Sequence, residues 1–311
     1  MDAAQRARLT GAPVFQPTFN CLWCGRPHQT RTADDIEGFA QLCPDCVGRA
    51  QDNDFLRFRL REGLQARARR DSGAAHRQPG PAADADAASD ASLRAYYSAR
   101  APEYDDWYLR RGRYSRGPLA DLAWSSDLDA ATMWLDGLPI SGEIVELAAG
   151  TGWWSPLLAQ KGQLWLYDAV EGPLDLARER LMAHGLAAHI HVRDAWAEPD
   201  RQVDALFTGF WLSHVPRQRL ADFLAICQRW LKPAGIFAFI DSRPDPDSGA
   251  LDNPPPTGDM STRRLADGRE FQIPKVYYTP TELEAAMHEA GFASADVTAT
   301  SRFFLLGRAT A

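Results

Sequence analysis

One carboxylate and a run of small residues stand where a binding turn is expected. Ile144 and Val145 form an apolar pair typical of a buried strand, Glu146 follows, and residues 148–152 read Ala-Ala-Gly-Thr-Gly before a helix-compatible segment resumes. Glycine lets the backbone approach a ligand closely, and a helix N-terminus presents free N–H groups. The stretch 144–155 therefore predicts a strand, a ligand-binding turn and a helix start.

Two ligand classes could use this turn. A dinucleotide fingerprint has the pattern G-x-G-x-x-G, but Ser155 occupies the third position, where close helix packing requires glycine. The carboxylate of Glu146 instead favours a cationic amino-acid ligand. With Glu146 and a small-x-Gly-x-Gly turn, the segment resembles motif I of the class I S-adenosylmethionine-dependent methyltransferases. Ala148 replaces the first glycine of that motif, which is a mild change because alanine is the smallest alternative.

The resemblance implies an S-adenosylmethionine site at the ends of parallel strands. Asp168 lies 20 residues after Ala148, a separation at which a carboxylate accepts both ribose hydroxyls in the general nucleotide-binding plan; a simple strand-end aspartate is the alternative. Asp194 would accept from the adenine amine, and Glu146 would help to neutralise the methionine ammonium, directly or through water. The cofactor-binding residues expected are Tyr97, Tyr104, Glu146, Ala148, Gly150, Gly152, Asp168, Ala169, Asp194, Ala195, Trp196 and Thr208.

The two tyrosines in that set come from a segment rich in aromatic and arginine residues, 96–110. This segment resembles the N-terminal lid of small-molecule methyltransferases, in which a tyrosine covers the cofactor. For Tyr97 and Tyr104, packing of the segment onto the core is the alternative role.

His214 is the candidate general base. Methyl transfer from a sulfonium is an in-line displacement, but a hydroxyl or ammonium acceptor must also lose a proton, and His214 is the best-placed residue beyond the fourth strand. Related enzymes often carry a histidine here without a catalytic role. We expect the acceptor pocket to use Trp211, Tyr277, Tyr278 and the segment after Asp241, and the aromatic share favours an apolar or planar acceptor.

Strand and helix signals alternate after residue 144. They predict an α/β fold, a Rossmann-like doubly wound sheet that is mostly parallel. Residues 295–300 and 303–306 predict two strands joined by a tight turn, and the family resemblance implies that the last strand is antiparallel. The pair Asp267 and Gly268 predicts a hairpin, and Cys227 falls on the apolar face of a helix, which makes it a core residue.

Four of the five cysteines form two C-x2-C pairs separated by 18 residues. In a reducing compartment this spacing indicates a metal site, and four thiolates can close a tetrahedral shell around one structural Zn²⁺. The arrangement resembles a zinc ribbon or treble-clef finger, and His28 is more readily explained as a loop residue than as a ligand. The predicted zinc ligands are Cys21, Cys24, Cys43 and Cys46.

Composition bounds the organisation of the 311 residues. Residues 1–70 form the expected zinc-binding module, 71–92 a flexible linker rich in Ala, Asp, Gly and Pro, and 93–311 the methyltransferase domain. The formal net charge of the chain is −7, made up of +3 on residues 1–70 and −10 on residues 71–311. This negative charge argues against a general binder of polyanions. No stretch is apolar enough to span a bilayer or to direct secretion, which predicts a cytoplasmic protein.

Three functions compete. The first is methylation of an O, N or C atom of a small molecule, with the zinc module serving stability, homodimerisation or docking of a protein partner. The second is methylation of RNA or protein, with the zinc module and its arginine-rich helix holding the macromolecule. The third is a cofactor-binding regulator whose zinc finger reads DNA. The acidic balance of residues 71–311 makes nucleic acid the less favoured partner.

Overall fold

The computed structural model describes residues 18–20, 26–29 and 81–311, and the chain divides into two compact units, Met1–Pro79 and Gly80–Ala311. In the first unit, β1 (Thr18–Asn20) pairs antiparallel with β2 (Pro27–Gln29). The predicted zinc ligands Cys21, Cys24, Cys43 and Cys46 lie outside the described residues, so the zinc module stays a prediction. Within the described residues, no cluster of His, Cys, Asp or Glu could hold a metal ion.

A seven-stranded sheet forms the centre of the second unit, in the order β10-β11-β7-β6-β3-β4-β5. β11 runs antiparallel to both of its neighbours, β10 and β7, and the other strands all run in one direction. This confirms the predicted mostly parallel sheet with an antiparallel last strand. The strands are β3 (Gly142–Leu147), β4 (Gly162–Asp168), β5 (His189–Val192), β6 (Val203–Gly209), β7 (Leu231–Ser242), β10 (Ser294–Ala299) and β11 (Phe304–Thr310).

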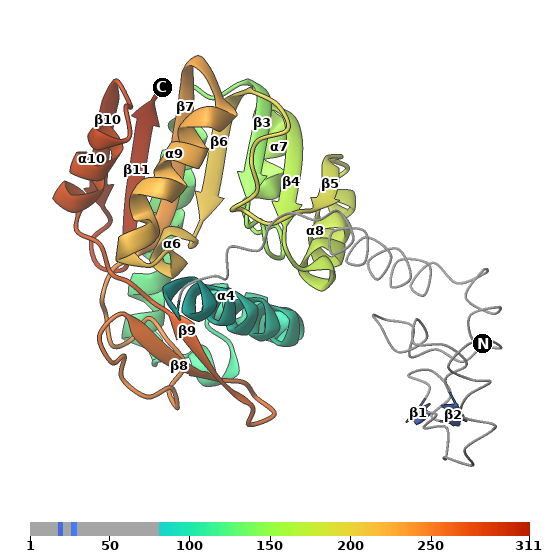
Figure 1. Ribbon diagram of the computed structural model, residues 1–311. Helices are drawn as coiled ribbons and strands as arrows, with labels where there is room; N and C mark the ends of the chain where they lie inside the picture. The colour runs from blue at the N-terminus through green and yellow to red at the C-terminus, as the bar shows by residue number, and fades with distance from the viewer. Residues whose placement is uncertain (1–17, 21–25, 30–80) are drawn as a thin grey trace, which may run out of the picture. The chain divides into compact units, whose positions relative to one another are not determined.

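Helices cover both faces of this sheet (Figure 1). On one face, Ile144 and Leu166 pack against residues of α6, α7 and α8, and on the other, Val145 and Leu147 pack against α9 and α10. Successive side chains of a strand point to opposite faces, so both faces of each central strand are buried. The helices are α6 (Pro118–Gly137), α7 (Ser155–Lys161), α8 (Glu171–Ala183), α9 (Leu220–Trp230) and α10 (Pro280–Glu289). Cys227 of α9 is fully buried, as expected.

The expected linker 71–92 is wrong in its second half, because helix α4 spans Pro81–Arg100. Alanine is frequent in flexible linkers, but it is also the strongest helix former, and Pro81 occupies a first helical position that proline favours. Leu93 and Tyr96, three positions apart on α4, are buried and anchor the helix. Residues 71–80 lie outside the described part of the chain.

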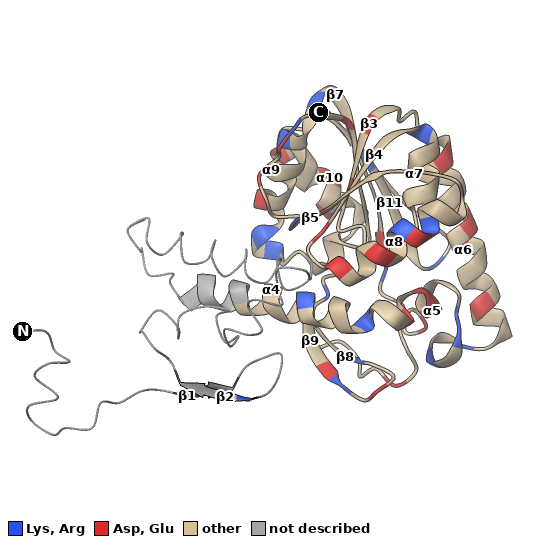
Figure 2. Cartoon of the chain, turned by 90° about the vertical axis from the view of Figure 1, so that its right-hand side faces the viewer, with Lys and Arg blue, Asp and Glu red and all other residues tan. Residues whose placement is uncertain are grey.

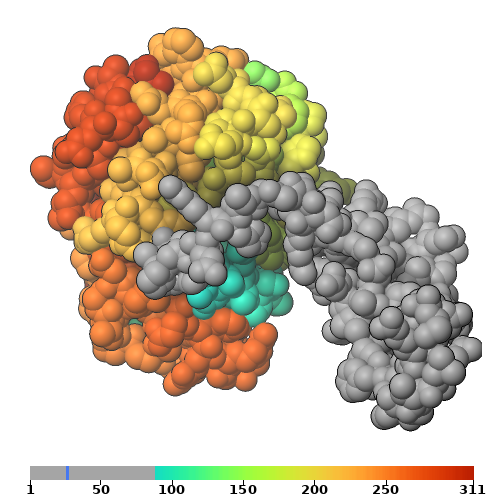
Figure 3. Space-filling model, in the orientation of Figure 1, coloured from blue at the N-terminus to red at the C-terminus, as the bar shows by residue number. Residues whose placement is uncertain are grey.

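Helix α4 packs against a separate hairpin, β8 (Met260–Arg264) and β9 (Glu270–Pro274), which turns at Asp267 and Gly268 as predicted. Leu93, Tyr96 and Ile273 share an apolar cluster, and Ser92 Oγ donates to the Gln272 carbonyl at 2.7 Å. Figure 3 shows the surfaces of the two segments side by side, cyan and orange. Short helical segments follow α4: η2 (Ala101–Glu103), α5 (Tyr104–Tyr108) and η3 (Gly112–Tyr114); η4 (Leu212–His214) and η5 (Arg217–Arg219) precede α9.

The turn after β3 holds Ala148 at φ 51°, in the left-handed region that suits glycine. The sequence interpretation of this residue as a mild replacement therefore needs correction. Its side chain is small enough for the space, but the backbone conformation is strained, and the cost for a residue with a Cβ atom is about 1 kcal/mol.

We predict that Ala148→Gly relieves this strain and leaves the melting temperature of the full chain unchanged or higher. Ala149→Gly is the matched control, because Ala149 has no positive φ and there glycine only adds freedom to the unfolded chain. The two variants should differ by about 1 kcal/mol in unfolding free energy, measured by chemical denaturation. A greater loss at position 148 than at 149 would contradict the strain.

Candidate functional site

A cavity of about 660 Å³ lies at the carboxyl ends of the central strands. Its walls come from the turns after β3, β4, β5 and β6, and α4 contributes Leu93 and Tyr97. Strands β3 and β6 are neighbours in the sheet but not in the sequence, so the strand order reverses between them. Open α/β sheets bind ligands at this kind of crevice.

Ten of the thirteen residues expected at the site line this cavity. They are Tyr97, Tyr104, Ala148, Gly150, Asp168, Ala169, Asp194, Ala195, Trp196 and His214. Glu146, Gly152 and Thr208 do not line it. Cofactor binding by all of these residues stays a prediction, but the sequence interpretation brought together residues that are neighbours in space.

Asp168 lies at the end of β4 and holds the turn after β3. Its Oδ2 accepts a hydrogen bond from the Gly150 amide at 2.8 Å, and its Oδ1 accepts one from the Val170 amide at 2.8 Å. Burial raises the pKa of Asp168 to about 6, against the lowering effect of these amides. Each carboxylate oxygen keeps a second lone pair that a ligand hydroxyl can use.

Glu146 is buried below the turn. Its Oε2 accepts a hydrogen bond from Ser155 Oγ, at the start of α7, at 2.5 Å, and only 1% of the residue is exposed. Burial raises the pKa of this carboxyl to about 8, although Ser155 and Arg180 both oppose the shift. Glu146 therefore joins the end of β3 to the start of α7 and does not line the cavity.

Gly152 and Thr208 also serve the structure around the cavity. A Cβ atom at Gly152 would lie 2.7 Å from the Cβ atom of Ala177, so this glycine lets the turn pack against α8. Thr208 is buried in β6, and its hydroxyl has no hydrogen-bond partner among the described residues.

The turn after β5 presents Asp194 to the cavity. One of its carboxylate oxygens accepts from the Trp196 amide at 2.9 Å, and the other forms an ion pair with Arg94 of α4 at 2.7 Å. Both side chains of this pair are partly exposed, so the contact contributes little to stability. Arg94 lines the same cavity, and the sequence interpretation did not include it.

His214 is held by hydrogen bonds at both ring nitrogens. Nδ1 lies 2.7 Å from the Pro274 carbonyl and must donate, because a carbonyl only accepts. Nε2 lies 2.6 Å from the hydroxyl of Tyr97 and accepts from it. Burial, followed by the charge of Lys275, lowers the pKa of His214 well below its ordinary value, so the ring is neutral. Neither nitrogen is free to take a proton directly from an acceptor.

A second cavity of about 510 Å³ adjoins the first. Tyr97, Tyr104, Phe210 and His214 line both cavities, so these four residues lie where the two cavities adjoin. Of the segment expected after Asp241, the residues Ser242, Ser248, Gly249 and Ala250 line the second cavity. Trp211 lines the first instead, and Tyr277 and Tyr278 line neither. Tyr278 is buried and donates to the Val215 carbonyl, whereas the Tyr277 side chain contacts Ser248 and Arg263, which line the second cavity.

The sequence interpretation missed the cations of the second cavity. Arg100, Arg263 and Lys275 line it together with aromatic residues, where an apolar or planar acceptor was expected. The arginine among the tyrosines of residues 96–104 was a visible signal. Arg263, which precedes Arg264 in β8, and Lys275, which follows the end of β9, come from the hairpin region, where the sequence gives no sign that a basic residue faces inward.

The sequence is similar to known methyltransferases over part of its length. Residues 144–235 match a family described as a methyltransferase domain. A ubiquinone/menaquinone biosynthesis C-methyltransferase, UbiE, of Azotobacter vinelandii is 31% identical over 112 residues, 33% of this chain and 44% of that protein. UbiE of Shewanella pealeana is 27% identical over 174 residues, which cover 50% of this chain and 68% of that protein. The chain thus spans less than half of the first of these relatives.

Two solved structures resemble the fold over a greater length. The DhpI-SAM-HEP complex aligns with a TM-score of 0.56 and 28% identity, covering 71% of this chain and 97% of DhpI. The DhpI-SAH complex aligns with a TM-score of 0.54 and 29% identity, covering 70% and 94%.

Glu146 makes the stability of the ligand-free protein depend on pH. The folded carboxyl keeps its proton up to about pH 8, whereas the unfolded one loses it above its ordinary pKa of 4.5. The unfolding free energy should therefore fall as pH rises from 4.5 to 8. In Glu146→Gln this contribution disappears, so the variant should gain at least about 1 kcal/mol on the wild type between pH 5 and pH 8.

Denaturant unfolding of both proteins across that range measures the difference. Asp168 titrates in the same range in both proteins, so its contribution cancels. A wild type and a variant whose curves stay parallel from pH 5 to pH 8 would contradict the raised pKa of Glu146.

Proposed function

We propose that this chain, which carries a class I S-adenosylmethionine-dependent methyltransferase domain, transfers a methyl group from S-adenosylmethionine to an O, N or C atom of a small molecule. The observation that carries the proposal is the pair of adjoining cavities, which share the lining residues Tyr97, Tyr104, Phe210 and His214. The first cavity, at the reversal of strand order, suits a nucleotide-containing ligand. The second suits the acceptor.

The residues of the first cavity fit S-adenosylmethionine in their chemistry. Asp168 would accept the ribose hydroxyls, Asp194 would accept the adenine amine, and the amides and glycines after β3 would pass beside the methionine part. When bound, the cofactor supplies an activated methyl group for an in-line displacement. This chain's contribution is alignment and exclusion of water, which Tyr97 and Tyr104 provide by closing the cavity from α4 and α5. That DhpI was solved with SAM and with SAH supports the same cofactor here.

The lining of the second cavity and the surface charge support a small acceptor. The second cavity holds about 510 Å³ of space, part of it open to solvent, and aromatic rings with a few polar and charged groups line it, which is typical of a small-molecule site. In Figure 2 acidic and basic residues intermingle over α8 and α9. Arg178 forms an ion pair with Asp175 on α8, and Arg229 of α9 forms one with Glu198 at 2.8 Å, so these arginines do not form a surface of one sign of charge, which nucleic-acid binding favours. None of the described helices is long and apolar enough to cross a membrane.

The first test is calorimetric titration of the full-length protein with S-adenosylmethionine and, separately, with NADH. We expect saturable binding of S-adenosylmethionine only. Asp168→Ala should weaken it at least about 10-fold, because charge-assisted hydrogen bonds contribute roughly 1.5–3 kcal/mol. The matched control is Asp175→Ala on α8, whose exposed carboxylate pairs only with Arg178. Binding of NADH, or unchanged affinity in Asp168→Ala, would overturn the cofactor assignment.

His214 is proposed as a positioning residue for the hydroxyl of Tyr97. Once labelled S-adenosylmethionine has identified an acceptor, His214→Phe should lower kcat/KM about 10-fold, and His214→Gln, whose amide oxygen can accept from Tyr97, should retain more activity. The wild type and His214→Gln should decline in parallel on acidification from pH 7.5 to pH 6, because the His214 ring is already neutral there and Asp168, whose pKa is about 6, titrates in both proteins. Equal loss in both variants, together with an acid decline that the wild type shows and His214→Gln lacks, would identify His214 as the base instead.

A further inference from the structure

Three cations face the second cavity, and none of the acidic residues in the described part of the chain lines it. Arg100 is 93% buried, its Nε has no hydrogen-bond partner, and its guanidinium contacts rings, with the Tyr104 centroid at 4.5 Å. Lys275 is 94% buried and donates only to two hydroxyls, Ser213 Oγ at 2.8 Å and Ser242 Oγ at 3.0 Å. Arg263 is half-buried beside Gly249.

These charges repel one another. Burial, and then the charges of Arg263 and Arg100, lower the pKa of Lys275 to about 8, against the opposing effect of Asp241. Asp241 is the one carboxylate acting on Lys275, and its oxygens already accept from the amides of Ser213 and Ser242. Among the groups that line the cavity and Asp241 behind them, three cations stand against one carboxylate, and two of these cations, Arg100 and Lys275, are buried. Buried positive charge in excess of the nearby carboxylates is costly unless a ligand compensates it.

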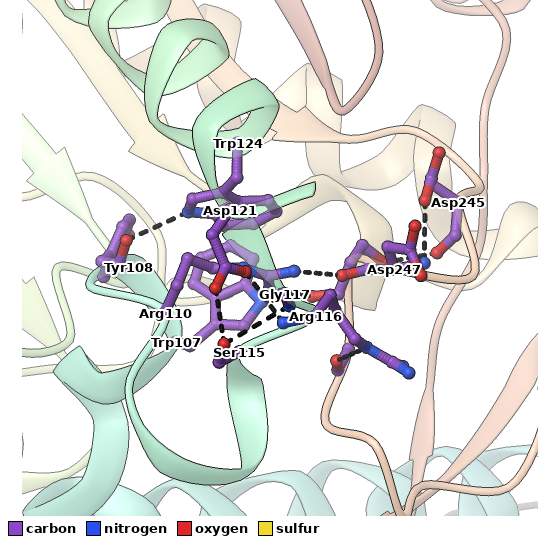
Figure 4. A network of polar contacts seen from close by, with 12 residues as sticks. Trp107, Tyr108, Arg110, Ser115, Arg116, Gly117, Asp121, Trp124, Asp245 and Asp247 are labelled. Atoms are coloured by element: carbon purple, nitrogen blue, oxygen red, sulfur yellow. Dashed lines mark hydrogen bonds and ion pairs between the residues drawn. The ribbon is translucent and has the colours of Figure 1, made fainter. Parts of the chain in front are cut away.

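The loop after β7, which lines the cavity together with these cations, is fixed in place. The loop after β7 supplies Ser248, Gly249 and Ala250 to the cavity, and side chains from the region of α5 and η3 bind its carbonyls (Figure 4). Arg116 donates to the carbonyls of Pro246 at 2.9 Å and Gly249 at 3.2 Å, and Trp107 Nε1 donates to the Ser248 carbonyl at 2.7 Å. A binding site held in this way loses little entropy when a ligand enters.

We propose that Arg100, Arg263 and Lys275 bind a small, doubly charged oxyanion of the phosphoryl type, which is the headgroup of the methyl acceptor. The excess charge matches a dianion, the guanidinium groups offer the forked donors that suit tetrahedral oxyanions, and Lys275 adds a point charge. The proposal rests on the proposed methyltransferase function, because the second cavity adjoins the first through Tyr97 and His214. The charged headgroup of the acceptor is thereby anchored in the second cavity, which leaves the rest of the acceptor to reach the first cavity past the shared residues.

The test is calorimetric titration of the full-length protein with inorganic phosphate, and separately with acetate, at constant ionic strength and with S-adenosylhomocysteine saturating. We expect saturable phosphate binding that is tighter than acetate binding. Lys275→Met and Arg263→Gln should each weaken it at least 10-fold. Arg269→Gln is the matched control, because this exposed arginine pairs with Asp267 outside the cavity. Absence of saturable binding, equal binding by all variants, or acetate binding as tight as phosphate binding would overturn the proposal.

Thermal unfolding separates loss of binding from loss of fold. Lys275→Met removes a buried cation that lies near two others, so its melting temperature should equal or exceed that of the wild type while phosphate binding falls. A lower melting temperature in Lys275→Met would indicate a structural role for this lysine and contradict the proposal. Before the phosphate titration, the protein is titrated with S-adenosylhomocysteine alone. Absence of S-adenosylhomocysteine binding would overturn the methyltransferase function. S-adenosylhomocysteine binding without phosphate binding would overturn the anion site alone.

Discussion

The described part of the chain depends on how one carboxylate joins the ends of two parallel strands. Asp168 closes β4, and its two oxygens hold the amides of Gly150 and Val170, so that the turn after β3 and the start of α8 take their positions from one side chain. A further bond from the Ala149 amide to the Tyr167 carbonyl, at 3.1 Å, continues the β3–β4 register into the turn. The positive φ angles of Ala148 and Gly150 persist because this framework fixes the residues on either side.

Burial raises the pKa of both acidic groups around this turn. Glu146 and Asp168 both have raised pKa values, with burial as the leading cause, and Glu146 has only one hydroxyl as a donor. A ligand that brought positive charge to the turn would favour the ionised forms of both. The second cavity carries the opposite charge, because Arg100, Arg263 and Lys275 line it, and the charges of Arg263 and Arg100 add to the effect of burial in lowering the pKa of Lys275. Asp90, Asp168 and Asp194 line the first cavity beside Arg94, so the two adjoining cavities differ in the sign of the charge that they present.

Much of this architecture could be predicted from the sequence, because it depends on local signals. The alternation of apolar runs with helix starts predicted the sheet, and Thr279 with Glu282 forms the capping box that begins α10. Strand-end residues such as Asp168 and Asp194 could be assigned to one site because parallel strands bring their carboxyl ends together. The predictions that failed concern features that depend on tertiary contacts. Residues 81–92 form a helix because α4 buries Leu93 and Tyr96 against a hairpin over 160 residues away, and Lys275 faces inward for reasons that only the folded hairpin supplies.

The location of the cationic residues has a consequence for inferring substrates from relatedness. Arg100, Arg263 and Lys275 all lie outside residues 144–235, the part that matches the methyltransferase domain family, whereas Asp168 and Asp194 lie within it. The second cavity is built largely from α4, the loop after β7 and the β8–β9 region, which flank that shared core in the sequence. Under the proposed function, evolution can exchange the substrate without altering the residues assigned to the cofactor. Two proteins alike over the core alone would then share a methyl donor and still modify unrelated compounds.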